Sequence, residues 1–253
     1  MTHPRIRFVI GGVQKAGTTA LARYLDAHPL VQLPLRKEAH VFDSADFDEA
    51  WSVEQIDQRY RTRMPAARDE ALAGDATPSY LFDADAVARI ARYNPAMRWI
   101  VLLRDPVERA LSHYYMERRR GRERWPLWPA LLLERWRLRR GGPGMATASP
   151  RRTFSYRARG DYAQQLDRLH AWFPREQVLL LTSDELSAAP AQCLQRVHAF
   201  LGLQTPAQTP VFTREFEGGY RRGGRYRLSR RLLRWLLRRE RAALRERYGI
   251  DFG

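Results

Sequence analysis

The 253-residue sequence has a single cysteine, Cys193, so it cannot form an internal disulfide bond. One thiol fits a reducing compartment, and we expect a cytoplasmic protein. No apolar run approaches the roughly 18 residues that suggest a membrane-spanning helix. The first residues lead directly into a predicted strand without a cleavage site, so we also expect no signal peptide.

Lysine is nearly absent as well. Only Lys15 and Lys37 appear among the 44 basic residues, and all the others are arginines. With 28 acidic residues, the formal net charge is +16. A chain this basic attracts anions, which include nucleic acid, lipid headgroups, and acidic small molecules or polymers. Both lysines lie near one glycine-rich segment, which hints at a local role for them.

The apolar pattern predicts an α/β fold. Hydrophobic residues make up 44% of the chain, as in a folded globular protein. Near-continuous apolar runs predict strands covered on both faces at residues 6–10, 99–103 and 177–181. Helical spacing appears between and after them, at residues 84–93, 107–118, 162–173 and 191–201. This alternation predicts three α/β/α layers around a central parallel sheet, in a single domain over residues 1–253.

Two basic segments leave alternatives open. Residues 119–157, with a predicted short helix at 130–138, form either a lid-like, substrate-shaping insertion or a mobile surface loop. Residues 219–247 contain twelve arginines and two glutamates, with apolar residues at helical spacing. They form either a core helix with a solvated basic face or a helix that lies on an anionic membrane. The membrane alternative would make the protein peripheral at a membrane surface.

A glycine-rich loop, GGVQKAGTTAL at residues 11–21, follows the first predicted strand and leads into a predicted helix. A strand, a glycine loop and a helix in this order point backbone N–H groups at an anion. Gly12 and Gly17 have the spacing of the loop G-x-x-x-x-G-K-[ST] that binds nucleoside triphosphates. Here, however, Thr18 occupies the lysine position and Lys15 lies inside the loop. The loop therefore predicts an anion site formed by N–H groups, two hydroxyls (Thr18 and Thr19) and Lys15, with a ligand other than the end of ATP.

A second motif, RDPVERALSHYY at residues 104–115, directly follows the second predicted strand. Ligands gather at the carboxyl ends of parallel strands, so Arg104 points where the first loop points if the two strands are neighbours. Pro106 suits the first turn of a helix, and Ser112 lies two turns along it. Arg104 and Ser112 are then candidates for one phosphate. The alternatives are a salt bridge from Arg104 to its acidic neighbours and an ordinary helical serine.

Two further segments contain polar residues that suit catalysis. In RKEAHVF, residues 36–42, Glu38 and His40 are two residues apart and would face the same side of an extended segment. Either side chain can act as a general base. GDATPSYLF, residues 74–82, is rich in turn residues, and its Thr-Pro-Ser-Tyr core is a candidate for positioning an acceptor.

Together the four segments resemble one enzyme family. The order G-x-Q-K-x-G-T-T, E-x-H-x-F, T-P-x-Y and R-D-P-x-E-R-x-x-S is similar to that of sulfotransferases that use 3′-phosphoadenosine 5′-phosphosulfate. The chain most resembles the heparan sulfate sulfotransferase type and its bacterial relatives. The likeness continues through GDYAQQLDRLHAWFPREQVLLL, FLGL and YGIDF, and it covers most of the chain apart from residues 119–157.

The resemblance implies a P-loop-like loop that binds phosphosulfate, and transfer of the sulfuryl group to a hydroxyl or amine of a carbohydrate or glycan. It implies that Glu38 is the general base, with His40 as the rival base, and that Lys15 stabilises the departing phosphate. It assigns donor binding to Lys15, Ala16, Gly17, Thr18, Thr19, Arg104, Ser112, Arg221 and Arg222. We expect no metal, and we expect the other arginines to attract an acidic glycan or peptide.

Other functions remain as alternatives. A tyrosylprotein sulfotransferase that acts on acidic peptides is also similar, but that family usually has arginine where Lys15 stands. A P-loop kinase would need lysine at Thr18 and a magnesium-binding carboxylate after the second strand, where Asp105 precedes Pro106. A basic protein that binds nucleic acid or a membrane surface would use the arginines of residues 219–247 without requiring the other motifs. We expect no nucleic-acid partner.

Overall fold

The computed structural model describes residues 5–66, 68, 70–142, 144–145, 149–206, 212 and 224–253, with side chains from residue 227 onward in the last range. The chain forms two compact units. The sheet unit contains Met1–Leu103 and Arg168–Phe216, and the helical unit contains Arg104–Asp167 and Glu217–Gly253. The assignment of the whole chain to one domain with an inserted lid stays a prediction.

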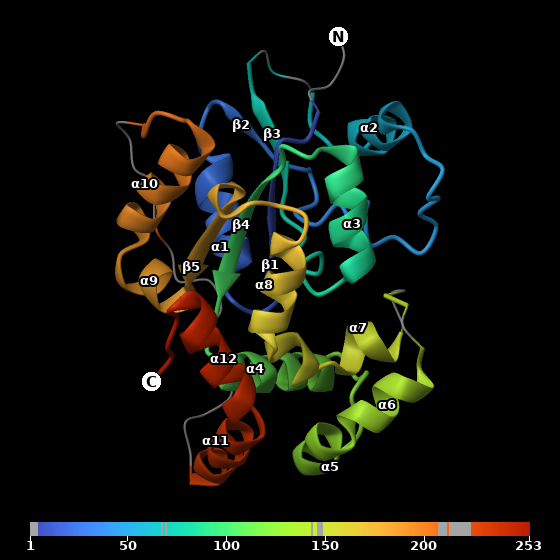
Figure 1. Ribbon diagram of the computed structural model, residues 1–253, viewed down its shortest axis with the longest axis vertical. Helices are drawn as coiled ribbons and strands as arrows, with labels where there is room; N and C mark the ends of the chain where they lie inside the picture. The colour runs from blue at the N-terminus through green and yellow to red at the C-terminus, as the bar shows by residue number, and fades with distance from the viewer. Residues whose placement is uncertain are drawn as a thin grey trace. The chain divides into compact units, whose positions relative to one another are not determined.

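A five-stranded parallel sheet forms the centre of the sheet unit (Figure 1). The strands run in the order β2-β3-β1-β4-β5 and comprise β1 (Phe8–Gly12), β2 (Val31–Gln32), β3 (Leu72–Asp75), β4 (Arg98–Leu103) and β5 (Val178–Thr182). The three predicted strands are confirmed to within two residues. The pattern missed β2 and β3, because β2 has two residues and β3 is a short LAGD segment without β-branched or aromatic residues.

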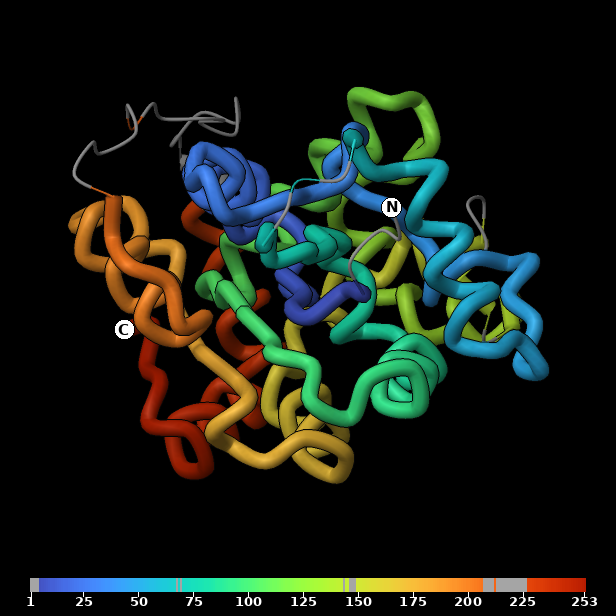
Figure 2. Tube along the Cα trace, turned by 90° about the horizontal axis from the view of Figure 1, so that it is seen from above, coloured from blue at the N-terminus to red at the C-terminus, as the bar shows by residue number. Residues whose placement is uncertain are grey.

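Helices cover both faces of this sheet and confirm the predicted α/β layers. They are α1 (Thr18–Asp26), α2 (Val53–Arg61), α3 (Ala84–Tyr93), α9 (Ser183–Ala188) and α10 (Pro190–Leu201), with a short 3₁₀ helix at Arg175–Gln177. The crossover through α1 runs from β1 toward β2, whereas the one through α3 runs the opposite way, from β3 to β4. Right-handed crossovers therefore place α1 and α3 on opposite faces. Figure 2 shows α1 in blue beside α10 in orange, and the two helices are in contact.

The strand order reverses direction between β1 and β4, which are hydrogen-bonded neighbours with Ile10 opposite Ile100. Such a reversal is where ligands bind in open parallel sheets. Close approach of the two strands requires glycine at position 11, because a Cβ there would lie 2.3 Å from the Trp99 ring. After β1, the Val13 N–H donates to the Leu102 carbonyl at 2.8 Å, so the glycine-rich loop begins beside the end of β4.

The helical unit is built around α4 (Pro106–Arg119). Its other elements are α5 (Leu127–Leu132), α6 (Glu134–Arg140), α7 (Pro150–Phe154), a 3₁₀ helix at Ala158–Gly160, α11 (Gly224–Leu236) and α12 (Arg238–Tyr248). A shared core joins apolar residues of α4, α5 and α11 with Tyr156. Helix α8 (Tyr162–His170) spans the boundary of the two units.

One helix was predicted at residues 130–138, but the structure has two helices in this region. Leu133 leaves the helical conformation between α5 and α6, with φ −92° and ψ 7°. The next residue, Glu134, is buried and accepts the N–H groups of Arg157 and Ala158 at 2.7 and 2.8 Å. This tertiary contact, which no local pattern encodes, sets the direction of α6. Within the described part of the chain, no helix is long and apolar enough to cross a membrane.

Candidate active site

The glycine-rich loop of residues 13–17 connects β1 to the first turn of α1. Lys15 and Gly17 adopt left-handed backbone conformations, with φ 76° and φ 99°. Gly17 precedes the first residue of α1, and because it has no side chain it cannot cap the first N–H groups of that helix. Thr18 is buried, whereas Gly17 and Thr19 are exposed. The loop therefore has the conformation that leaves N–H groups at a helix N-terminus accessible to an anion.

Ser183, the first residue of α9, ties this loop to the sheet. Its Oγ lies 2.6 Å from the Ala16 carbonyl oxygen and 3.1 Å from that of Leu103, so one hydroxyl bridges the loop and the end of β4. The Ala16 N–H donates in turn to the Val13 carbonyl at 3.1 Å. Sequence reasoning missed Ser183. Its position just after the third predicted strand was the available signal, because strand ends meet at one edge of a parallel sheet.

If the loop binds adenosine 3′,5′-bisphosphate, as the resemblance implies, Ser183→Ala should weaken that binding by about 2- to 13-fold, the equivalent of one neutral hydrogen bond of roughly 0.5–1.5 kcal/mol. The loop would lose the bridge that sets the direction of its N–H groups. Isothermal titration calorimetry measures the effect. Ser187→Ala is the matched control, because Ser187 is an exposed serine in the same helix. Equal affinities for the two variants would contradict this role for Ser183.

Glu38 and His40 are in direct contact. His40 Nε2 lies 3.1 Å from Glu38 Oε2, and His40 Nδ1 lies 3.1 Å from Asp43 Oδ2. The ring thus links an exposed carboxylate to a buried one. Residues 38–40 form no strand, and His40 has a left-handed backbone conformation with φ 51°. The left-handed turn at His40, rather than strand alternation, is part of the backbone that brings the two side chains together.

The environment of Glu38 stabilises its ionised form. Burial alone would raise its pKa, but the hydrogen bond with His40 and the positive charge of Lys37 outweigh burial and lower the pKa to about 2. The carboxylate is therefore ready to accept a proton at neutral pH. Its side chain is 38% exposed, so an acceptor hydroxyl can reach it. A base with so low a pKa is intrinsically weak, and any change that removes a positive partner strengthens it.

Lys37 connects Glu38 to the glycine-rich loop. Its Nζ lies 3.2 Å from Glu38 Oε1 and donates to Thr18 Oγ1 at 3.3 Å. The sequence drew attention to Lys37 only through its rarity and its nearness to the loop. In the structure it is the contact between the candidate base and the first residue of α1. A ligand that binds at the loop and attracts the ammonium group would weaken its hold on Glu38.

Lys37→Met should raise the pKa of Glu38 above its value of about 2. Removal of an opposite charge at this range typically shifts a carboxylate by roughly one unit or more. The direction is upward because Lys37 favours the charged form. A titration of the Glu38 side-chain carboxyl carbon by NMR tests this, with Arg36→Met as a control that removes a neighbouring charge. A titration curve unchanged by Lys37→Met would contradict the coupling.

The Thr-Pro-Ser-Tyr segment supports the residues around Glu38 and His40. Asp75, at the end of β3, is fully buried and accepts hydrogen bonds from three hydroxyls, namely those of Thr77 at 2.7 Å, Tyr80 at 2.7 Å and Tyr60 at 2.8 Å. The Val41 N–H donates to Tyr80 Oη at 3.1 Å. This segment was a candidate for positioning an acceptor. Its hydrogen bonds also position the segment that carries the candidate base.

A second set of hydrogen bonds fixes Asp43 itself. Ser79 Oγ donates to Asp43 Oδ2 at 2.6 Å, and the His40 N–H approaches Thr77 Oγ1 at 3.4 Å. Asp43 is buried, so its partners must satisfy its carboxylate. Asp43 and Asp75 were missed by sequence reasoning. Neither belongs to a recognisable spacing, and only the fold brings β3 and the following turn beside residues 38–43.

Arg104 and Ser112 belong to the helical unit. Arg104 is the residue that follows β4, and its carbonyl accepts a hydrogen bond from Tyr162 Oη at 2.9 Å. Asp105 caps α4, because its Oδ1 accepts the N–H groups of residues 107 and 108 at 2.7 and 3.0 Å. Ser112 is buried in α4. Glu108, the other acidic neighbour, forms a salt bridge with Arg230.

Two of the residues predicted to bind the donor, Arg221 and Arg222, lie outside the described residues.

Among the residues that are described, no group of three or more His, Cys, Asp or Glu side chains is arranged to hold a metal ion. The structure brings Lys37, Glu38, His40 and Thr18 together within the sheet unit. The roles of the individual residues in binding and catalysis remain proposals.

Comparison with known proteins gives this arrangement a family. Residues 5–215 match the sulfotransferase domain family. Human heparan sulfate glucosamine 3-O-sulfotransferase 3B1 is 34% identical over 197 residues, which cover 78% of this chain and 46% of that protein. The mouse heparan sulfate glucosamine 3-O-sulfotransferase 6 is also 34% identical, over 78% of this chain and 52% of its own length. The chain thus spans about half the length of the curated relatives it matches.

Solved structures agree with this family. A sulfotransferase from Alicyclobacillus acidocaldarius superposes with a TM-score of 0.79 at 30% identity, over 98% of both chains. The sulfotransferase domain from the curacin biosynthetic pathway has a TM-score of 0.52 at 15% identity, covers 82% of this chain and 77% of its own, and shows the fold alone. On the family match, the identity to these relatives and the full-length structural agreement, the chain belongs to the sulfotransferase family.

Proposed function

We propose that this protein transfers a sulfuryl group from 3′-phosphoadenosine 5′-phosphosulfate to a hydroxyl group of a carbohydrate or glycan. The observation that carries the proposal is the contact of Lys37 with both Glu38 and Thr18. It connects a carboxylate suited to act as a general base with the loop suited to bind a phosphate. Sulfuryl transfer requires both groups, because a proton leaves the acceptor while charge develops on the leaving phosphate.

In the proposed reaction, Glu38 takes the proton of the acceptor hydroxyl as the acceptor oxygen forms a bond to sulfur. The bond between sulfur and the bridging oxygen of the 5′-phosphate breaks, and adenosine 3′,5′-bisphosphate leaves with the electron pair. Lys15 and the N–H groups at the start of α1 stabilise the added negative charge on the leaving phosphate. The negative charge of the bound donor attracts Lys37 and weakens its contact with Glu38. The pKa of Glu38 then rises, and the carboxylate becomes a stronger base.

His40 positions Glu38 in this scheme. Asp43 is buried and holds one ring nitrogen, while the other nitrogen faces Glu38. The ring can therefore orient the carboxylate and share the proton that it accepts. His40 as the base is the alternative. Its Nε2 is occupied by Glu38 at 3.1 Å, which favours Glu38 as the group that meets the acceptor.

Similarity to the heparan sulfate 3-O-sulfotransferases supports a glycan acceptor. The residue before the Thr-Pro-Ser-Tyr segment is Ala76, which is fully buried. A fully buried methyl side chain cannot contact an acidic sugar, so other residues must recognise the acceptor. Transfer of ³⁵S from labelled donor to a panel of glycans and tyrosine peptides separates the glycan acceptor from the peptide alternative. Labelled peptide without labelled glycan would overturn the glycan proposal.

The donor assignment predicts selectivity for the 3′-phosphate. Adenosine 3′,5′-bisphosphate should raise the melting temperature far more than 5′-AMP does. Arg104→Ala should weaken its binding about tenfold or more, because a hydrogen bond to a charged group is worth roughly 1.5–3 kcal/mol. Arg119→Ala is the control, since Arg119 is exposed at the end of the same helix α4. Equal thermal shifts with the two nucleotides would contradict the assignment. Thermal shifts with ATP and with DNA, measured in the same way, test the kinase and the nucleic-acid-binding alternatives.

A further inference from the structure

Large apolar side chains are exposed on the outer faces of two helical segments in the helical unit. Leu132 is 53%, Leu133 46% and Trp136 48% exposed where α5 meets α6. On α11, Leu228 is 62% and Trp235 59% exposed. These five are all of the exposed large hydrophobic residues in the described part of this unit. Single exposed leucines are ordinary, whereas exposed tryptophans and leucines that are near one another in a helix are a candidate interaction surface.

The outer face of α11 combines these apolar residues with arginine. Leu228 and Trp235 are seven residues apart and so lie on one side of the helix. On the opposite side of the helix Leu233 is buried in the core around α4, and Leu237, which follows α11, is buried in the same core. The exposed arginines of α11 near Leu228 and Trp235 are Arg227, Arg231 and Arg234, and the exposed Arg238 begins α12 (Arg238–Tyr248). The guanidinium of Arg238 lies 4.6 Å from the Trp235 ring centre.

The face of α6 repeats this composition. Trp136 lies in α6, three residues after the Leu133 break that ends α5, and the exposed arginines of α6 are Arg135, Arg139 and Arg140. The Arg140 guanidinium lies 4.4 Å from the Trp136 ring centre. Helices α5 and α11 both contribute residues to the core around α4, and Figure 1 shows both helices beyond α4 at the same end of the unit. The two faces therefore belong to one packed body.

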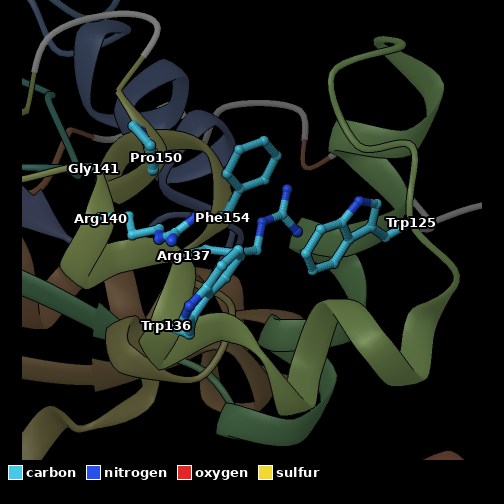
Figure 3. A pocket seen from close by; sticks show the side chains of 7 residues that line it. All are labelled: Trp125, Trp136, Arg137, Arg140, Gly141, Pro150 and Phe154. Atoms are coloured by element: carbon cyan, nitrogen blue, oxygen red, sulfur yellow. The ribbon is translucent and has the colours of Figure 1, made fainter.

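A shallow pocket of about 240 Å³ lies beside Trp136 (Figure 3). Arg137 forms part of its wall, but its charge is already used in a salt bridge with Glu123 at 2.6 Å. The same guanidinium lies 3.5 Å from the Phe154 ring centre and 4.4 Å from that of Trp125. Arg137 is therefore part of the packing, and the pocket offers mainly aromatic and aliphatic surface. Such a surface suits an apolar group rather than an anion.

Acidic residues are scarce on these faces. Glu134 is the single acidic residue of α5 and α6, and it is buried against backbone N–H groups. Residues 224–238 contain no aspartate or glutamate at all. The exposed charge around the five apolar side chains is therefore positive. A partner must offer negative charge and apolar volume in the same place.

We propose that the outer faces of α6 and α11 bind the surface of an anionic lipid bilayer. A bilayer interface supplies headgroup phosphates for the arginines and acyl chains for the leucines and tryptophans, which is the combination that interfacial helices use. A soluble polyanion such as an acidic glycan or a nucleic acid would use the arginines alone. It would gain nothing from Leu132, Leu133 and Leu228. The predicted core helix with a basic face and the predicted membrane helix are then two sides of α11.

Vesicle flotation with the full chain tests the proposal. The protein should float with vesicles of phosphatidylcholine that contain about 30% phosphatidylserine, and it should stay behind with phosphatidylcholine alone. The double variant Leu228→Ser with Trp235→Ser should lower the partition constant for these vesicles by about tenfold or more. The double variant Leu132→Ser with Trp136→Ser should also lower it. Leu30→Ser with Trp172→Ser is the matched control, since both are exposed residues of the sheet unit.

Heparin affinity separates the lipid from a soluble polyanion. The Leu228 and Trp235 double variant keeps every arginine, so it should elute from heparin at the same salt concentration as the unmodified protein. Loss of vesicle binding with unchanged heparin elution supports the bilayer. Vesicle binding that survives both double variants, or binding that is equal with neutral vesicles, overturns the proposal. Circular dichroism melting shows that each variant is folded, and vesicle flotation and heparin elution do not depend on the proposed reaction.

Discussion

Glu38→Gln is expected to lower kcat by roughly 10²–10⁴-fold, the usual contribution of a general base. Glutamine keeps the size of the side chain and its contact with Lys37, but it cannot take the acceptor proton. Affinity for adenosine 3′,5′-bisphosphate should change little, because the proposed phosphate contacts come from the glycine-rich loop. Rates measured with labelled donor and a saturating acceptor, together with calorimetric binding, separate the two effects.

His40→Ala must be measured beside Glu38→Gln. We expect a smaller loss of kcat, because His40 acts on the reaction through the position of Glu38. Glu176→Gln, a change at an exposed residue of the sheet unit, is the control. Normal turnover by Glu38→Gln with an inactive His40→Ala would transfer the role of base to His40 and leave the sulfotransferase assignment intact. If neither change reduces the rate of an active preparation, the proposed mechanism fails.

Lys15→Met is expected to lower kcat by about 10²–10³-fold, comparable to the loss of one preorganised group at a developing negative charge. The ammonium would act mainly on the leaving phosphate, whose charge is greatest in the transition state. Methionine keeps a side chain of similar length, so the left-handed backbone at this position, with φ 76°, keeps the same steric demand. Single-turnover rates with labelled donor measure the effect on the chemical step.

The pattern of kinetic constants distinguishes two roles for Lys15. A fall in kcat means that the lysine interacts more strongly with the transition state than with the bound donor. An unchanged kcat with a raised donor KM would mean that it only helps to bind the donor, and would contradict the role proposed here. Arg36→Met removes another positive charge close to this site in sequence and should leave both constants close to those of the unmodified protein.

Much of the fold could be predicted because its signals are local. An apolar run buried on both faces, a helix with one apolar side and a glycine loop between them each depend on residues within a few positions of one another. The strands β1, β4 and β5 and the helix α3 were therefore predicted with their approximate bounds. The order of the motifs also sufficed to suggest the family. The sequence left open whether β1 and β4 are neighbours, and only the structure shows that they pair.

The arrangement of the candidate site was decided by tertiary structure. Asp75 meets Tyr60 and Ala39 through contacts that span 15 and 36 residues, and Ser183 reaches Ala16 across 167. No periodic pattern encodes such pairs, because the segments that carry them are turns and short irregular stretches without a repeating spacing. The sequence alone determined which chemical groups are present and in what order. Packing of the strands determined which of them touch, because a side chain in an irregular segment is oriented by its distant neighbours.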